Sequence, residues 1–454
     1  MTRSSGEFVF ALALLCAGPA GAEPGAFTPA AAGCPMAHCD ARMSGRVNVV
    51  SPTSASLIGI DVDTLGSKAG LGCVSNTRTV ACTNGGDPLT QSNLVVYDAS
   101  GHRLWEDHGV LGPSAWMSVP ILARDGSLIA TDQDWILRAD PAANRIVWQS
   151  RKPDAGFPIS PVLVGADDSM VLLTTNSSGA GSTAELSVWD VATGALLSHQ
   201  PIIDPVTGRL YVTRNTAAVR GNRAYVLTAA ELDETDGRLY AIDICGSATC
   251  GGRGAVTLSW HHDFKGPSSS SPLLIGSRLF FDGRSGVRGG TFTAVADDGD
   301  APRLVWKQPF SARFVVSAAQ DPRGGLWVYP ALTDALLRLN PQTGAIDQKV
   351  VMSQALGLAP GYTPASVVSV SASPAGAVVL LVGAQARNED GPTYVAAVDV
   401  GSTPAGSALW KYEVAPTGGF NVTPGQFPLV VAPSGARRIV FRGSNSSIYF
   451  VGEP

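Results

Sequence analysis

The sequence has few charges and almost no long apolar runs, and both absences narrow the class of protein. Only 15% of its 454 residues are charged, and the net charge is −5 with a pI near 5.7. A chain without a basic excess is poorly suited to bind phosphate-rich partners, so we expect neither nucleic acid nor an anionic membrane surface as a partner. Beyond the N-terminus, no apolar stretch approaches the roughly 20 residues of a membrane span, and no span is expected.

The single long apolar run lies at the N-terminus, where it indicates export. Arg3 provides a short basic region, residues 8–17 form the apolar core, and Ala20-Gly21-Ala22 is a small-x-small cleavage site. The run is too short for a retained anchor helix. Cys16 follows two leucines rather than the small residue that a lipid-attachment site requires. We therefore expect a signal peptide over residues 1–22, cleavage near Ala22, and a periplasmic or secreted protein.

Cysteine is scarce, but its distribution is informative. Loss of Cys16 with the signal peptide leaves six cysteines, an even number that suits an oxidising compartment. Their proximity favours three local disulfide bonds, although six cysteines allow about fifteen pairings. No CxxCH haem motif is present and no spacing matches a zinc site, so free thiols or a metal site are the weaker alternative. The expected pairs are Cys34/Cys39, Cys73/Cys82 and Cys245/Cys250.

Glycine and proline are abundant, and the chain repeats itself. The 51 glycines and 31 prolines fit many short strands joined by tight turns. Several segments share an alternating apolar strand, an Asp or Asn turn, and a second strand that often closes on Trp. They cover residues 94–105, 135–148, 186–197 and 336–346, with looser copies at 239–260, 292–306 and 394–410.

Each later copy is preceded by a further pair of short strands, which makes four strands per unit, the pattern of a propeller blade. Residues 428–453 supply three strands of one more unit, and an incomplete blade would expose backbone groups at its edge. We expect residues 45–50 to complete that blade. The prediction is an all-β protein with a lead-in over residues 23–44 and one β-propeller over 45–454. It has about eight four-stranded blades, seven being the alternative, and we expect a monomer.

The pattern of turn and Trp resembles the blade motif of quinoprotein-type eight-bladed propellers. PQQ-dependent alcohol dehydrogenases and the outer-membrane assembly lipoprotein of the BamB type share this fold. The segment from Cys34 to Asp40, followed by Gly45, is similar to the WPMFxHDxxxTG lead-in of exported members of this group. The resemblance implies that one tryptophan per blade packs between neighbouring blades. These anchors would be Trp105, Trp148, Trp260, Trp306 and Trp410, with Leu197 and Ile346 in weaker copies.

The same resemblance implies what a working dehydrogenase of this type needs, namely an adjacent Cys-Cys disulfide over the quinone and an Asp base beside calcium ligands. The sequence contains neither. We therefore predict no cofactor, with PQQ and Ca²⁺ as the alternative. The weak candidates for a metal site are His38, between two cysteines, and the run His261, His262 and Asp263. Their other interpretation is a disulfide-closed loop and an ordinary outer strand.

A rigid ring with variable loops is a common host for recognition, because the scaffold fixes the loops in space. We therefore expect an exported, non-catalytic scaffold that recognises protein or carbohydrate through one propeller face. The alternative is a PQQ-dependent dehydrogenase-like protein or another enzyme that acts in the central channel. Fold alone does not decide between these functions.

Overall fold

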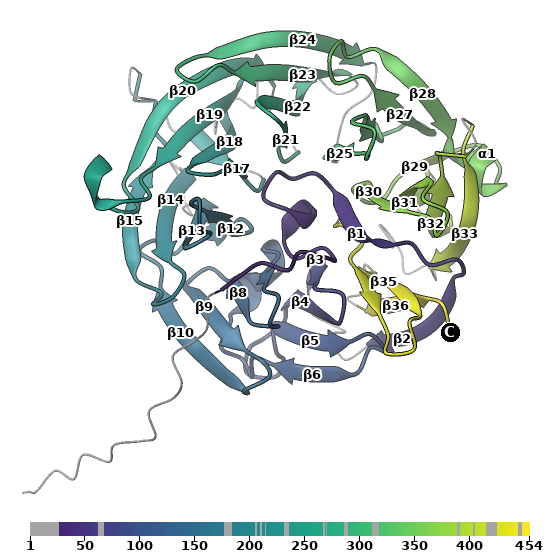
Figure 1. The fold of residues 1–454 in the computed structure, drawn as a ribbon, viewed down its shortest axis with the longest axis horizontal. Coiled ribbons are helices and arrows are strands. Elements are labelled where there is room, and N and C mark those ends of the chain that lie inside the picture. The colour runs from purple at the N-terminus through teal and green to yellow at the C-terminus, as the bar shows by residue number, and fades with distance from the viewer. Residues whose placement is uncertain are drawn as a thin grey trace, which may run out of the picture.

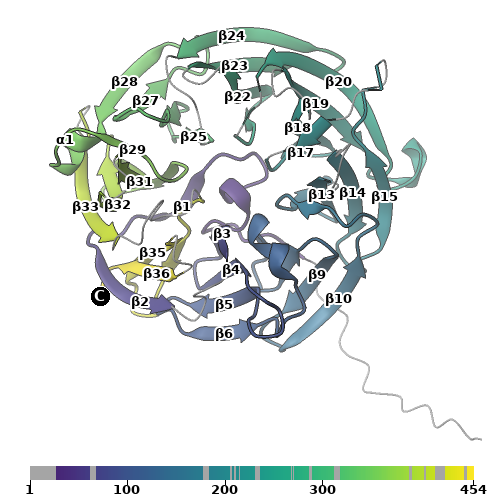
Figure 2. The ribbon, with the colours of Figure 1, turned by 180° about the vertical axis from the view of Figure 1, so that it is seen from behind.

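The structure, a computed structural model, contains eight separate β-sheets within the residues that it describes. Figure 1 shows these sheets as blades around one axis, and Figure 2 shows the same ring from behind. The predicted all-β propeller with eight blades is therefore confirmed. The described residues are 27–61, 68–176, 184–204, 207–208, 211–213, 215–230, 236–266, 268, 270–285, 289–310, 317–387, 391–402, 405–414, 425–443 and 447–454.

We number the blades along the chain, and each runs from an inner strand at the axis to an outer strand at the rim. Blade 1 contains β3 (Lys68–Ser75), β4 (Thr79–Gly85), β5 (Leu94–Asp98) and β6 (Arg103–Glu106). Blade 2 contains β7 (Ile121–Leu122), β8 (Leu128–Thr131), β9 (Trp135–Asp140) and β10 (Arg145–Arg151). Blade 3 contains β11 (Phe157–Pro158), β12 (Val162–Val164), β13 (Met170–Asn176), β14 (Ala184–Asp190) and β15 (Leu196–Pro201). Blade 4 contains β16 (Tyr211–Thr213), β17 (Ala218–Arg220), β18 (Arg223–Ala230), β19 (Asp236–Ile244) and β20 (Val256–Lys265).

The second half of the ring repeats this arrangement. Blade 5 contains β21 (Leu273–Ile275), β22 (Arg278–Ser285), β23 (Gly289–Asp297) and β24 (Pro302–Phe310). Blade 6 contains β25 (Ala319–Gln320), β26 (Leu326–Val328), β27 (Ala335–Leu339) and β28 (Ile346–Val351). Blade 7 contains β29 (Tyr362–Pro364), β30 (Ser369–Ala372), β31 (Val378–Ala386), β32 (Thr393–Asp399) and β33 (Ser407–Val414), and blade 8 contains β34 (Leu429–Val431), β35 (Arg437–Arg442) and β36 (Ile448–Gly452).

The position of a strand within its blade explains its sequence. A middle strand such as β31 packs against the blades on both sides, so all nine of its residues are buried and its sequence is almost continuously apolar. An outer strand such as β33 has one covered face and one exposed face, and its residues alternate accordingly. Apolar side chains from adjacent blades therefore form the core between the sheets.

The tryptophans expected between blades lie within the outer strands, and four of the five donate a hydrogen bond to the next blade or to the segment that enters it. The indole N–H of Trp148 donates to the carbonyl of Val191 at 2.9 Å. That of Trp410 donates to the carbonyl of Pro52 at 2.7 Å, and this bond links blade 7 to the segment that enters blade 8. The two other pairs are Trp260 with Asp297 and Trp306 with Pro341. Trp105 is 8% exposed in the core that blades 1 and 2 share.

An N-terminal strand completes blade 8, but it is not the expected one. The strand that pairs with β36 is β2 (Ser56–Asp61). The segment predicted for this role forms β1 (Arg46–Val50), which instead runs parallel to the inner strand β30 of blade 7. The prediction that residues 45–50 complete blade 8 was wrong. Both N-terminal segments have strand-forming sequences, so the sequence alone does not show which of them pairs with β36. The length of chain between them allows the second to reach the rim, while the first stays at the axis.

Because the strands within each blade pair antiparallel, with the added strand β1 as the exception, connections of one kind emerge on one face of the ring. The turn face carries the short turns between first and second and between third and fourth strands, with helix η3 (Ala248–Cys250). The loop face carries the connections between second and third strands and between blades, with helices η2 (Pro113–Met117) and α1 (Met352–Leu356). No helix in the described part of the chain is long and apolar enough to cross a membrane.

Candidate functional site at the propeller axis

The described part of the lead-in, residues 27–44, lies inside the ring. It starts near the turn face, where the carbonyl of Thr28 accepts a hydrogen bond from the N–H of Arg124 at 2.8 Å. Residues 34–45, which we call the axial plug, then turn through the short helix η1 (Ala37–Cys39) before the chain continues into β1. In Figure 1 this N-terminal segment is the purple ribbon in the middle of the ring.

The second half of the plug is hydrogen-bonded in turn to four successive blades. Each of four plug carbonyls accepts a hydrogen bond from the backbone N–H of an inner strand, at 2.6 to 2.9 Å. This pattern satisfies polar groups that would otherwise face the channel without a partner, and each such bond adds roughly 0.5–1.5 kcal/mol. The acceptor and donor pairs are Ala41 with Val219, Arg42 with Leu274, Ser44 with Gln320 and Gly45 with Val370.

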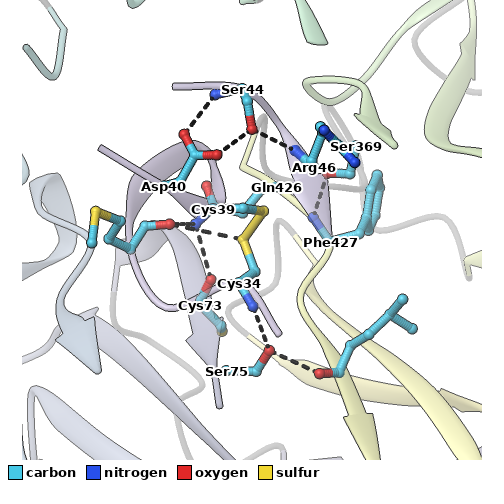
Figure 3. Close-up of a disulfide and its surroundings, with 12 residues drawn as sticks. Cys34, Cys39, Asp40, Ser44, Arg46, Cys73, Ser75, Ser369, Gln426 and Phe427 are labelled. Carbon is cyan, nitrogen blue, oxygen red and sulfur yellow. Dashed lines mark hydrogen bonds between the residues drawn. A yellow bond between two sulfur atoms is a disulfide. The ribbon is translucent and has the colours of Figure 1, made fainter. Parts of the chain in front are cut away.

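The first half of the plug binds the remaining side of the ring. Cys34 exchanges two backbone hydrogen bonds with Ser75 of β3, at 3.0 and 2.8 Å, and the carbonyl of Pro35 accepts from the N–H of Leu122 in β7 at 2.7 Å. The side chain of Gln426, next to blade 8, donates to the carbonyl of Met36 at 3.3 Å. Figure 3 shows the disulfide with Ser75 and Gln426 beside it. The plug therefore contacts blades on every side of the axis.

The local sequence explains the tight path. The disulfide between Cys34 and Cys39 closes the first turn. The Asp40 carboxylate closes the second, because it accepts hydrogen bonds from the N–H of Arg42 at 2.9 Å and from both the N–H and the hydroxyl of Ser44. Positive φ angles, uncommon outside glycine, occur at His38, Cys39 and Met43. Such strained backbone persists only where the surroundings fix it, and it is common at functional sites.

His38 is the titratable side chain at the tip of the plug. Its Nε2 lies 3.4 Å from the hydroxyl oxygen of Ser317, which itself accepts a hydrogen bond from the N–H of Ser271 at 2.9 Å. Desolvation inside the ring lowers the pKa of His38 to about 4. The imidazole is therefore neutral at physiological pH and can exchange hydrogen bonds, but it carries no charge.

The carboxylate of Asp282 is buried in β22, in the inner half of blade 5. Its partners Ser268 and Ser270 come just before Ser271 in the sequence. The hydroxyls of Ser268 and Ser270 each donate to Oδ1 of Asp282 at 2.5 Å. Burial raises the pKa of Asp282 to about 6, against the opposing effect of these two hydrogen bonds. Near neutral pH the imidazole of His38 is therefore uncharged, whereas the carboxyl of Asp282, with a pKa of about 6, is mostly ionised.

This arrangement does not fit the quinone that the fold family implies. A polyanionic planar quinone requires cations for its carboxylates, an aromatic floor and a divalent ion at its reactive edge. The axis is instead filled by the plug, whose buried side chains include Met36, Met43 and the disulfide. Across the described residues, no group of three or more His, Cys, Asp or Glu side chains is placed to hold a metal ion.

The other weak metal candidates lie away from the plug. His261, His262 and Asp263 belong to β20, the outer strand of blade 4, whereas His38 is at the axis. The Asp263 carboxylate is paired with Arg238, and burial lowers the pKa of His262. The structure therefore does not bring the four residues together. It has disulfides between the three local cysteine pairs, Cys34–Cys39, Cys73–Cys82 and Cys245–Cys250.

No protein-family model matches the chain, and no curated protein matches its sequence. A solved europium-containing methanol dehydrogenase is similar in structure, with a TM-score of 0.59 and 11% identity over 93% of this chain and 98% of the dehydrogenase. The two chains share the propeller fold. A quinohemoprotein alcohol dehydrogenase from Comamonas testosteroni matches less closely, with a TM-score of 0.45 and 12% identity over 93% of this chain and 81% of its own. Identities this low show a similarity of fold alone.

Sequence reasoning found His38 and its flanking cysteines but missed the position of the whole segment in the channel. The two glycines that flank the plug were the available signal. A side chain at Gly33 would lie 2.5 Å from the carbonyl oxygen of Ser75, and one at Gly45 would lie 2.8 Å from the Cβ of Ala319. Glycines that bracket a disulfide loop are expected where a backbone passes close to other strands.

Proposed function

We propose that the protein is an exported, non-catalytic binding module that recognises a protein partner through its loop face. The observation that carries this proposal is the axial plug, because it occupies the position at which a propeller enzyme would hold a substrate or cofactor. The plug backbone is bonded to the inner strands, so the ring is a rigid scaffold with a filled centre. Recognition then falls to the connections around the axis.

Exposed apolar side chains on the loop face favour a protein partner over a carbohydrate. Leu89, between β4 and β5, is 91% exposed, and Leu332, between β26 and β27, is 57% exposed. Phe157, which follows the linker into blade 3, is also exposed. Aliphatic side chains gain free energy when a protein surface covers them, whereas sugars are mostly bound by polar groups and aromatic rings. Export itself rests on the expected signal peptide, whose residues lie outside those described, and is supported by the three disulfides.

Site-specific photo-crosslinking in the cell that makes the protein tests the proposal. A photo-reactive p-benzoylphenylalanine replaces Leu89 or Leu332 on the loop face, and in matched controls it replaces Leu304 or Ile346. These control leucine and isoleucine residues are 51% and 49% exposed on outer strands near the turn face. We expect a discrete protein adduct from the loop-face positions alone. Adducts of equal yield from all four positions, or from the controls alone, would contradict the proposal.

A second candidate is a dehydrogenase that uses PQQ with a metal ion. The supporting observation is the similarity in fold to the europium-containing methanol dehydrogenase over nearly the full length of both chains. The plug that fills the axis and the lack of a metal-binding group among the described residues argue against this candidate. A titration with PQQ separates the two candidates.

A further inference from the structure

Three titratable side chains meet between blades 2 and 3 at the loop face, away from the plug. Asp154 lies in the linker between β10 and β11, Glu185 lies near the start of β14, and His199 lies on β15. The Nε2 atom of His199 is 3.4 Å from Oε2 of Glu185 and 3.8 Å from Oδ1 of Asp154. Glu185 pairs with Thr175 on β13, and His199 pairs with Ser187 on β14, so these side chains share one face of the sheet.

In this cluster the shielded carboxylate oxygens outnumber the hydrogen-bond donors unless an additional proton is bound. Oδ1 of Asp154 and Oε2 of Glu185 are both shielded from solvent, and neither accepts a hydrogen bond. The other oxygen of Asp154 is satisfied, because it accepts from the hydroxyl of Thr175. A single N–H at Nε2 of His199 can serve only one of the two free oxygens. A buried carboxylate oxygen without a donor is unfavourable, and a bound proton removes the deficit.

Within the residues that the structure describes, no lysine or arginine forms an ion pair with either carboxylate. Lys152 is the nearest lysine on the same linker, but its ammonium donates to the carbonyls of Asp132 and Gly156 at 2.8 and 2.9 Å. Burial lowers the pKa of this lysine to about 8, against the charges of Asp154, Asp132 and Asp134, which raise it. The charged groups that face the cluster are therefore Lys152 and the carboxylates themselves.

We propose that Asp154, Glu185 and His199 form a proton-operated latch that fastens the linker over residues 152–156 to the sheet of blade 3. Asp154 belongs to the linker, whereas Glu185 and His199 belong to the sheet, so the two carboxylates lie on opposite sides of the contact. With a proton bound, the contact is held by hydrogen bonds. Without it, two adjacent negative charges on a shielded surface repel each other and loosen the linker. This proposal is independent of the proposed binding function.

The direction of the pH effect follows from Glu185. Burial, and then the charge of Asp154, raises the pKa of Glu185 from 4.5 to about 7. The folded protein therefore binds this proton more tightly than the unfolded chain does. The stabilisation is complete below pH 4.5 and is lost as the pH rises through about 7. The latch is closed in mildly acidic solution and open in alkaline solution.

Infrared spectroscopy of the intact protein during a pH titration tests the latch, because a protonated carboxyl has its own C=O absorption. We expect a component of this band that disappears with a midpoint near pH 7 in the wild type, and we expect that component to be absent in Glu185→Gln. Asp282 is a second source of the same band, and Asp282→Asn identifies its share. In the control Glu413→Gln, on the outer strand β33, the Glu185 band should remain. Absence at pH 6 of the component that titrates near pH 7, or its survival in the double variant Glu185→Gln, Asp282→Asn, would overturn the proposal.

Two further measurements test the latch even if the Glu185→Gln variant folds poorly. His199→Asn removes the imidazole N–H between the two carboxylates, so the midpoint of the band should move to higher pH. Amide hydrogen exchange over residues 154–156, corrected for the intrinsic pH dependence, should speed up several-fold between pH 6 and 8.5 in the wild type. An unchanged midpoint in His199→Asn, or linker exchange that does not depend on pH, would contradict a latch at this position.

Discussion

Thr53 and Glu453 are 400 residues apart in sequence, yet the hydroxyl of Thr53 donates to the carboxylate of Glu453 at 2.9 Å. The N–H of Thr53 donates to the same oxygen at 3.0 Å, and the guanidinium of Arg437 donates to the other oxygen at 3.1 Å. These bonds lie where β2 joins β36 and closes the ring. The first and last parts of the propeller are therefore joined by charge-assisted hydrogen bonds as well as by a sheet.

The substitution Glu453→Gln should weaken this closure. The hydrogen bonds lower the pKa of Glu453 from 4.5 to about 2, against the effect of partial burial. Because the folded pKa is depressed, the stabilisation is present above pH 4.5 and is lost as the pH falls to about 2. We expect Glu453→Gln to lower the free energy of unfolding by roughly 1–3 kcal/mol at pH 7 and to flatten its dependence on pH between 5 and 2. Urea unfolding at several pH values measures both effects, and an unchanged slope would contradict the closure.

The approach of the plug to blade 1 should make Gly33→Ala strongly destabilising. The φ angle of Gly33 is 89°, and an added Cβ would lie 2.5 Å from the carbonyl oxygen of Ser75. Gly126 is a matched control, because its φ is 90° and no atom lies within 4 Å of an added Cβ. Both variants incur the strain of a positive φ, roughly 1–2 kcal/mol, but only Gly33→Ala also displaces a neighbouring strand. Equal losses of stability in the two variants would contradict the position of the plug.

The disulfide at the tip of the plug closes a small loop, so we expect it to make a modest contribution to the free energy of unfolding. For the short separation between Cys34 and Cys39, the chain-entropy estimate is about 2 kcal/mol. The double variant Cys34→Ser, Cys39→Ser should lose this amount in urea unfolding. It should also show faster amide exchange at Val219 and Val370, which donate to plug carbonyls. Thiol titration of the unfolded, non-reduced wild type should find no free thiol, and two or more would contradict the three pairs.

The sequence predicted the blades because their signals are local. The turn after β14 shows why, since the Asp190 carboxylate accepts a hydrogen bond from the N–H of Thr193, and Gly194 adopts a positive φ. The Asp, Thr and Gly that make this turn lie within five residues, and the same pattern recurs in other blades. The indole hydrogen bond from Trp148 to Val191 then connects neighbouring units. A repeat that carries its own turn and its own anchor is visible without knowledge of the ring.

The arrangement at the axis and the proton latch could not be predicted, because they depend on contacts distant in sequence. The parallel pairing of Arg46 with Val370 joins segments that share no local signal. Asp154, Glu185 and His199 are brought together only by the register of three strands and a linker. A shift of one residue in that register would turn these side chains to the opposite face.

The titration of the protein with PQQ, in the presence of Ca²⁺ and separately of a lanthanide ion, tests the central claim that the plug has replaced an axial cofactor. Isothermal calorimetry should detect no saturable binding under either condition, and no PQQ-dependent reduction of a redox dye should accompany alcohol or sugar substrates. One-to-one binding at micromolar affinity or tighter, together with dye reduction that depends on it, would contradict the binding-module account and support the dehydrogenase.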